Sequence, residues 1–384
     1  MRSALLIFLL WLAGLGAAAQ FAKMGLIFPE LAAVYPGAGA SLGWLVSLVS
    51  VLGAVLGLFA GLIAVRIGLR RLLLAALALG AASSFAQAAL PSFGWMLLSR
   101  VVEGASHLGI VVVAPTLIAQ LADERWRGFA MTLWGTFFGV AFALVAWLGL
   151  PLVAAYGPDA LFVAHGAALA AVAVPLALML PRVVHDKAPF SWAAIGWRHV
   201  AVYRSPRMGA PAAGWLFYTI TYVSLATVLP GTVPAEARGF VAGAMPIASI
   251  VSSLTLGVWL LRRTSAVGVI VLGFALAAVL AAALAFAGGS VWLPVALFAA
   301  LGLVQGASFA AVPELNASAE GRANANGGMA QMGNLGNGLG TPVLLALLAA
   351  AGFSATMLAV AATLLGGLFV HLWLARRRVT RSAP

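Results

Sequence analysis

Long apolar segments follow one another along almost the whole chain, and they constrain its fold more than any other feature. Hydropathy predicts twelve of them, each with about the 20 residues that an α-helix needs to cross a bilayer. They lie near residues 4–28, 41–64, 72–92, 95–121, 129–153, 158–180, 210–233, 239–261, 266–288, 291–313, 325–350 and 353–375. The sequence therefore predicts an all-α membrane protein with twelve transmembrane helices.

The composition fits this class of protein and excludes others. Of the 384 residues, 64% are hydrophobic and 8% are charged, with a mean hydropathy of +1.09. The net charge of +12 would suit a nucleic-acid partner, but the charges fall in short loops between apolar segments, so none is expected. The lack of cysteine excludes disulfides and thiolate sites. Without HExxH, GxSxG or metal-ligand spacing, we predict no enzyme, no cofactor and no metal site.

The basic residues predict the orientation in the membrane. If the N-terminus is cytoplasmic, 18 of the 21 lysines and arginines fall in cytoplasmic segments, as the positive-inside rule requires. Both termini are then expected to be cytoplasmic. The N-terminus could also be a signal peptide, but its apolar run continues past Ala19 to about Phe28, which predicts an uncleaved first span.

The two halves of the chain repeat one another. Pro29 and Pro230 lie near the ends of the first and seventh spans, and VEGAS (102–106) in the fourth span matches VQGAS (304–308) in the tenth. The order and spacing predict two pseudo-symmetric six-helix bundles, residues 1–180 and 209–384. Residues 181–208 form a cytoplasmic linker, either an amphipathic interfacial helix or a plain connection.

The fourth span carries the ionisable residues that point to function. Arg100, Glu103 and His107 share one helical face inside an apolar run, and such residues normally face a protein interior or an aqueous cavity. Glu103 and His107, four residues apart, predict a proton relay in which Arg100 takes part. The alternative is a structural ion pair between Arg100 and Glu103, with His107 neutral and hydrogen-bonded.

A second set of polar and aromatic residues predicts contacts with a substrate. Lys23 and Gln20 lie late in the first span, although Lys23 could instead extend to the outer headgroups. Together with Arg100, Lys23 gives an excess of embedded cations, which favours an anionic or zwitterionic substrate such as a carboxylate. The other candidates, for which helix packing is the alternative, are Trp134, Tyr218, Tyr222, Gln305, Gln331 and Asn334.

Two motifs, GLIAVRIGLRR (61–71) and SRVVEGASHLG (99–109), resemble signatures of the major facilitator superfamily, and the resemblance covers nearly the whole chain. GLIAVRIGLRR (61–71) resembles the superfamily's signature loop in Gly61, Arg66, Gly68, Arg70 and Arg71, with Val65 in place of the usual Asp. SRVVEGASHLG (99–109) resembles the fourth-helix signature. The first motif implies a gating loop, and the second implies a role for its arginine in proton coupling or substrate binding.

The resemblance implies a monomeric secondary transporter that works by alternating access. We therefore predict proton-coupled transport, such as symport, of a small organic solute across a bacterial inner membrane. The alternative is a proton-coupled exporter of drugs or hydrophobic metabolites, although the fifth span (131–149) lacks the Gly-Pro core of the antiporter signature. A channel or a sensor would not need buried charges in a duplicated bundle.

Overall fold

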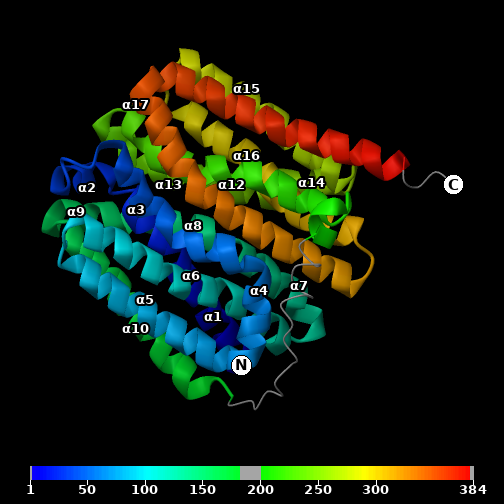
Figure 1. The fold of residues 1–384 in the computed structure, drawn as a ribbon, viewed down its shortest axis with the longest axis horizontal. Coiled ribbons are helices and arrows are strands. Elements are labelled where there is room, and N and C mark those ends of the chain that lie inside the picture. Colours follow the sequence, from blue (N-terminus) through cyan, green and yellow to red (C-terminus); the bar gives the residue numbers. More distant parts are fainter. Residues whose placement is uncertain (1, 182–199, 381–384) are drawn as a thin grey trace. The chain divides into compact units, whose positions relative to one another are not determined.

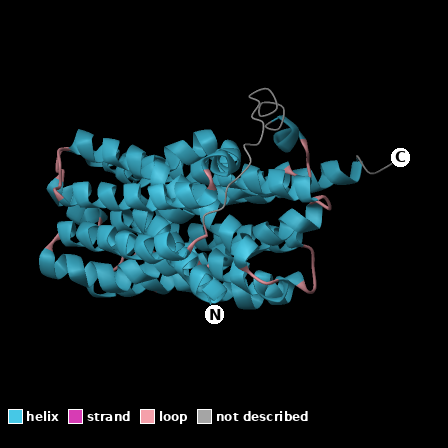
Figure 2. Ribbon diagram, turned by 90° about the horizontal axis from the view of Figure 1, so that it is seen from below, coloured by secondary structure: helices cyan, strands magenta, loops and turns pink. Residues whose placement is uncertain are grey.

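A computed structural model describes residues 2–181 and 200–380, and every regular element within them is a helix (Figure 2). The chain forms two compact units, Met1–Phe190 and Ser191–Pro384. Each unit is described by itself below. The predicted interfacial helix of the linker falls largely on residues 182–199, which lie outside the described residues.

The N-terminal unit is built around four helices that enclose its apolar core. Leu10, Leu77, Ile110 and Leu169 are among the buried core residues, one from each of α1, α5, α6 and α10. Helix α5 packs between α6 and α10 (Figure 1). The helices of this unit are α1 Arg2–Gly25, α2 Phe28–Val34, η1 Gly39–Leu42, α3 Gly43–Ser47, η2 Leu48–Ser50, α4 Val51–Ile67, α5 Leu69–Ala88, α6 Phe93–Leu121, α7 Glu124–Gly135, α8 Phe137–Leu144, η3 Val145–Gly149, α9 Leu150–Tyr156 and α10 Pro158–Met179.

The end of α10 is held by two arginines from distant parts of the sequence. Arg2 donates from Nη2 to the Met179 carbonyl at 2.9 Å, and Arg70 donates from Nη2 to the Ala177 carbonyl at 2.6 Å and from Nε to the Leu180 carbonyl at 3.1 Å. The last carbonyls of a helix have no partner within it, so these arginines satisfy the end of α10.

In the C-terminal unit, α12 packs closely against α17. A Cβ placed on Gly340 would lie 2.2 Å from the Ile220 carbonyl oxygen, so glycine lets these two backbones approach. Helix α15 packs against α16 and α17, and α13 packs against α16. The helices of this unit are α12 Gly209–Val228, η4 Leu229–Thr232, α13 Ala235–Ser252, η5 Ser253–Gly257, α14 Val258–Leu261, α15 Ala266–Phe286, α16 Trp292–Leu315 and α17 Ala319–Thr380.

Within the described residues, 11 helical segments are long and apolar enough to cross a membrane. The last of them includes most of the 62-residue α17, in which Gly352 has non-helical dihedral angles (φ 77°, ψ 177°). Two helices therefore meet directly at Gly352, which lies between the predicted spans 325–350 and 353–375. The count of twelve spans and the cytoplasmic position of both termini stay predictions.

The sequence repeat corresponds to a repeated packing contact. Gly104 of α6 lies against Val49, where an added Cβ would be 2.6 Å from the Val49 carbonyl oxygen. Its counterpart in α16, Gly306, lies against Ser253, where an added Cβ would be 2.3 Å from the serine Oγ. The small residue of each matching motif thus allows close contact with a neighbouring helix of the same unit.

Candidate functional site

The N-terminal unit encloses a group of buried side chains that we call the buried polar cluster. Its members come from α1, α5, α6 and α10 and are all buried. They are Gln20, Lys23, Ser84, Gln87, Arg100, Glu103, Ser106 and His165. Because buried charge is costly unless it is paired, an arrangement of this kind inside an apolar bundle indicates a functional site.

Glu103 lies between two cations. Its Oε1 accepts a hydrogen bond from Lys23 Nζ at 2.7 Å, and its Oε2 accepts hydrogen bonds from Arg100 and from Gln87 Nε2, the latter at 2.8 Å. Arg100 and Glu103 are three residues apart on α6, whereas Lys23 comes from α1. With both bases charged and His165 neutral, the cluster holds two cations and one carboxylate, which leaves positive charge in excess.

Arg100 is fixed by the backbone of two other segments. Its Nε donates to the Leu45 carbonyl at 2.7 Å, and its Nη2 donates to the Gln20 carbonyl at 2.7 Å. Arginine keeps its charge in proteins and donates in a planar fork, so these bonds hold one orientation of the guanidinium beside Glu103. Arg100 therefore connects α1, α3 and α6 in addition to pairing with the carboxylate.

Lys23 makes more contacts than any other member of the cluster. Besides Glu103, its Nζ donates to the Ser84 hydroxyl and to Gln87 Oε1, the latter at 2.7 Å. The ring of Phe162 lies beneath the ammonium group, with its centroid 5.5 Å from Nζ. Lys23 therefore points into the interior of the N-terminal unit, where its ammonium group is fully buried.

His165 of α10 completes the cluster and was not predicted from the sequence. Its Nδ1 lies 2.6 Å from Ser84 Oγ and 3.3 Å from Lys23 Nζ, and its Nε2 lies 2.9 Å from the Gly16 carbonyl oxygen. The available signal was its position inside an apolar span, because an ionisable residue in a membrane helix is a functional candidate by default. Ser84 and Gln87 of α5 were also missed, since polar residues in a Ser- and Ala-rich helix give little signal.

His107 lies apart from the hydrogen bonds of Glu103. The hydrogen bond described for it joins Nδ1 to the Ala17 carbonyl at 3.0 Å, and its ring contacts Phe21 edge-on at 5.1 Å. Spacing of four residues on one helix places two side chains near one another without fixing where each one points. The predicted relay between Glu103 and His107 therefore has no hydrogen bond described for it.

A glycine on α5 makes room for the cluster. A Cβ at Gly80 would lie 2.4 Å from Ser106 Oγ and 3.1 Å from Gln20 Nε2. These two side chains bond to one another, with Gln20 Nε2 donating to Ser106 Oγ at 3.1 Å. Gly80 thus permits α1, α5 and α6 to meet at a polar contact.

The C-terminal unit holds a row of aromatic rings in contact with one another at the predicted tyrosines. Trp215 stacks on Tyr218 at 4.6 Å, Tyr218 lies 5.2 Å from Tyr222, and Tyr222 lies 4.8 Å from Phe298. Phe309, which is half exposed, contacts Trp215 at 5.1 Å. We call Trp215, Tyr218, Tyr222, Phe298 and Phe309 the aromatic row.

The predicted amides of this unit make contacts of different kinds. Gln305 Oε1 accepts a hydrogen bond from Ser249 at 3.3 Å, and Asn334 Nδ2 donates to the Ala330 carbonyl of its own helix at 2.8 Å. Gln331 Oε1 accepts from the Tyr203 hydroxyl at 2.7 Å, and partial burial raises the pKa of Tyr203 to about 12, which keeps this donor protonated. In the other unit, Trp134 stacks on Phe137 at 4.5 Å and lies against Gly14.

The predicted gating loop, residues 61–71, is mostly helical: it covers the end of α4, Gly68 and the start of α5. Gly68 has a φ of 93°, a conformation that favours glycine, while Arg66 and Arg71 are exposed. Arg70 is bound to the end of α10, as described above. Arg70 of this motif therefore contacts another helix of the N-terminal unit.

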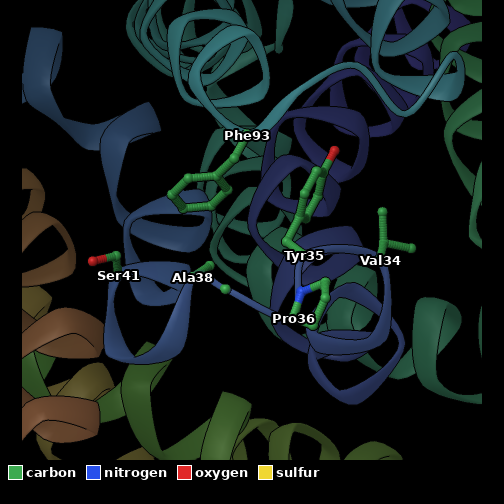
Figure 3. A pocket seen from close by; sticks show the side chains of 7 residues that line it. Val34, Tyr35, Pro36, Ala38, Ser41 and Phe93 are labelled. Carbon is green, nitrogen blue, oxygen red and sulfur yellow. The ribbon is translucent and has the colours of Figure 1, made fainter.

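The pocket between α2 and the start of α6 is a poor candidate for the site. It is lined by Val34, Tyr35, Pro36, Gly37, Ala38, Ser41 and Phe93 (Figure 3). Tyr35 donates to the Pro91 carbonyl at 2.8 Å, and burial raises the pKa of this phenol. None of the lining residues carries a charge, so the buried polar cluster remains the candidate site.

Comparison with known proteins places this fold in a family. The sequence model of the Major Facilitator Superfamily matches residues 6–315. The chain is 34% identical over 102 residues to the inner membrane transport protein YajR of Escherichia coli (strain K12), a match that covers 27% of this chain and only 22% of that protein. The crystal structure of a variant of the E. coli fucose:proton symporter FucP is similar with a TM-score of 0.66 and 16% identity, covering 97% of this chain and 99% of that one. At this identity the likeness shows a shared fold.

Proposed function

The chain belongs to the Major Facilitator Superfamily, and from this premise we propose that it is a proton-coupled secondary transporter of a small organic anion or zwitterion, such as a carboxylate. It would act by alternating access in a bacterial inner membrane, as a monomer with both termini in the cytoplasm. The name of the relative YajR includes the words "inner membrane", which supports the proposed location. The similar structure FucP is a fucose:proton symporter, which supports the proposed coupling.

One observation carries this proposal: a single buried carboxylate is shared by two buried cations. Glu103 occupies donors of both Lys23 and Arg100, which a carboxylate group of a substrate could also occupy. Protonation of Glu103 would weaken its bonds to both cations and leave them free to bind an anion. Proton uptake and anion binding would then favour one another, which is the linkage that symport needs.

The remaining candidates are proposed as substrate contacts or as coupling residues. Gln20 touches Arg100 through its backbone carbonyl and Ser106 through its side chain, so it belongs to the same site. Contact of Trp134, Tyr218, Tyr222, Gln305, Gln331 and Asn334 with substrate stays a proposal, as does a part for His107 in proton movement.

A thermal-shift screen of the detergent-purified protein tests the proposal. The panel contains organic anions, zwitterions and lipophilic cations at pH 5.5 and 7.5, and ligands that bind the folded state raise the melting temperature by mass action. We expect carboxylates to stabilise the wild type and to have no effect on Arg100→Ala. The pH dependence of this stabilisation should disappear in Glu103→Gln.

Each shift is measured against the melting temperature of the same variant without ligand. Glu236→Gln, which removes an exposed carboxylate in the first turn of α13, is the matched control and should respond like the wild type. Stabilisation by lipophilic cations alone, independent of Arg100, would overturn the anion proposal.

The aromatic row supports a second candidate function, proton-coupled export of drugs or hydrophobic metabolites. Aromatic side chains bind planar apolar molecules, and Phe309 at one end of the row is half exposed. In that case Trp215→Ala should reduce stabilisation by lipophilic cations, while Arg100→Ala should not.

A further inference from the structure

Ser84 lies between a lysine and a histidine in the buried polar cluster. Its Oγ accepts a hydrogen bond from Lys23 Nζ and lies 2.6 Å from His165 Nδ1, while Nζ and Nδ1 are 3.3 Å apart. The three residues come from α1, α5 and α10, so tertiary packing alone brings them together. All three are buried.

The far side of the histidine ring determines which nitrogen carries the proton. His165 Nε2 lies 2.9 Å from the Gly16 carbonyl oxygen, which can only accept. Nε2 must therefore be the protonated nitrogen of the neutral ring, and Nδ1 must be an acceptor. A proton on Nδ1 instead would set the lone pair of Nε2 against that of the carbonyl.

The donors of Lys23 then determine the direction of the bonds at Ser84. An ammonium group has three hydrogens, and the three oxygen acceptors around Nζ belong to Ser84, Gln87 and Glu103. The Ser84 hydroxyl accepts from Lys23, so its own hydrogen is available for Nδ1 of His165. The bonds thus form one directed chain, from Lys23 through Ser84 to His165.

We propose that Lys23, Ser84 and His165 form the proton-exchange site of this transporter, an inference that rests on the proposed proton coupling. In the transfer, Lys23 Nζ gives a proton to Ser84 Oγ as the Ser84 hydroxyl gives its own proton to His165 Nδ1. The result is a neutral amine at Lys23, an unchanged hydroxyl and an imidazolium at His165. One proton moves and the charge of the cluster stays constant.

The charges around the chain suit such an exchange. Glu103 faces Lys23 directly, Arg100 faces Glu103 from the other side, and Gln87 is the neutral neighbour on α5. When the proton moves to His165, Lys23 weakens its hold on Glu103 while Arg100 keeps its own. Among the described residues of this unit, His107 is also a buried histidine, but it faces Ala17 and lies outside the chain of bonds.

The test places 15N in the side chains of histidine and lysine in the full-length protein and follows their NMR signals with pH. The probe is the proton itself. The spectra are simple, because the sequence has five histidines and its two lysines are Lys23 and Lys187. His165→Gln, His107→Gln and Lys187→Arg assign the signals.

We expect His165 to show the Nε2-protonated tautomer at neutral pH. The signals of Lys23 Nζ and His165 Nδ1 should follow the same macroscopic titration steps with the same midpoints, because the protons of a coupled pair belong to the pair and not to either residue. Ser84→Ala should shift the Nδ1 signal of His165, whereas Ser84→Thr, which keeps the hydroxyl, should restore it. The signal of His371 in the other unit serves as the control and should not respond to either change.

An Nδ1-protonated tautomer of His165, or separate midpoints for Lys23 and His165, would overturn the inference. A Lys23 signal that changes with pH together with the His107 signal, and not with the His165 signal, would overturn it as well. The first two outcomes are read from the wild-type spectra once the signals are assigned. If His165→Gln fails to fold, the His165 signal is the one that remains after the other four histidines are assigned by substitution, so the test is not blocked. No substrate is needed, so these outcomes would leave the anion-transport proposal intact, and a failed ligand screen would leave the proton pair intact.

Discussion

At the scale of single residues, Glu103 offsets the mutual repulsion of Lys23 and Arg100, the two cations of the buried polar cluster. Removal of one partner from a buried ion pair costs roughly 3–5 kcal/mol, because a charge is left uncompensated. Glu103→Gln leaves two buried cations, whereas Lys23→Met leaves the Arg100–Glu103 pair intact. We therefore expect a lower melting temperature for Glu103→Gln than for Lys23→Met.

The double variant gives the sharper measurement. Lys23→Met with Glu103→Gln leaves one cation in the cluster, as in the net charge of the wild type, so the two losses should not add. We expect the double variant to melt at or above the temperature of Glu103→Gln alone. Additive losses would show that packing and not charge determines the stability of this site.

Prediction from the sequence found four of the eight residues of the buried polar cluster, namely Gln20, Lys23, Arg100 and Glu103. Arg100 and Glu103 were predicted together because they share a helical face, and Lys23 and Gln20 were candidates because they are polar residues late in the first apolar span. His165, Ser84 and Gln87 were not found, because their partners lie on other helices and no spacing in the sequence records that contact. His107 was placed beside Glu103 by spacing alone, whereas its described hydrogen bond goes to the backbone of α1.

At the scale of elements, the repeated glycines predict different costs for the same substitution. Gly104→Ala would press on the Val49 carbonyl, a backbone atom, and should cost about 1–3 kcal/mol of stability as overpacked sites do. Gly306→Ala would press on the Ser253 hydroxyl, which can rotate away, and should cost less. Melting temperatures of the two variants test this order.

Gly94→Ala is the control on the same helix as Gly104. An added Cβ there meets nothing within 4 Å, so the change should be close to neutral. Equal losses for Gly94→Ala and Gly104→Ala would contradict an explanation based on close packing. Comparison of Gly104→Ala with Gly306→Ala tests whether the glycines of the VEGAS and VQGAS motifs serve the same kind of contact in both units.

Most elements were predictable because apolar segments of membrane length give a strong signal. The exceptions are local. The fifth and eighth spans contain the π-helical turns η3 and η5, which depend on backbone hydrogen bonding that hydropathy does not record. The junction at Gly352, in contrast, falls at the two-residue gap between the predicted spans 325–350 and 353–375.

At the scale of the whole molecule, the distribution of basic residues predicts which loops face the cytoplasm. The chain has no cysteine, so single cysteines report their own accessibility. Thr264 lies in the loop after α14, beside Arg262 and Arg263, and Ala287 follows α15 at its other end. A membrane-impermeant maleimide applied to intact cells should label Ala287→Cys and not Thr264→Cys.

Opening the cells should make both positions reactive, since both are exposed. Labelling of Thr264→Cys in intact cells would reverse the proposed orientation and place both termini outside.

The complete burial of Lys23 has a practical consequence for observing the protein at work. After Lys187→Arg, Lys23 is the last side-chain amine in the chain. A small acylating reagent can reach that amine only while the interior of the N-terminal unit is open to water. The rate at which the acyl group accumulates on the peptide that contains Lys23 would therefore report those openings without a substrate or a dye.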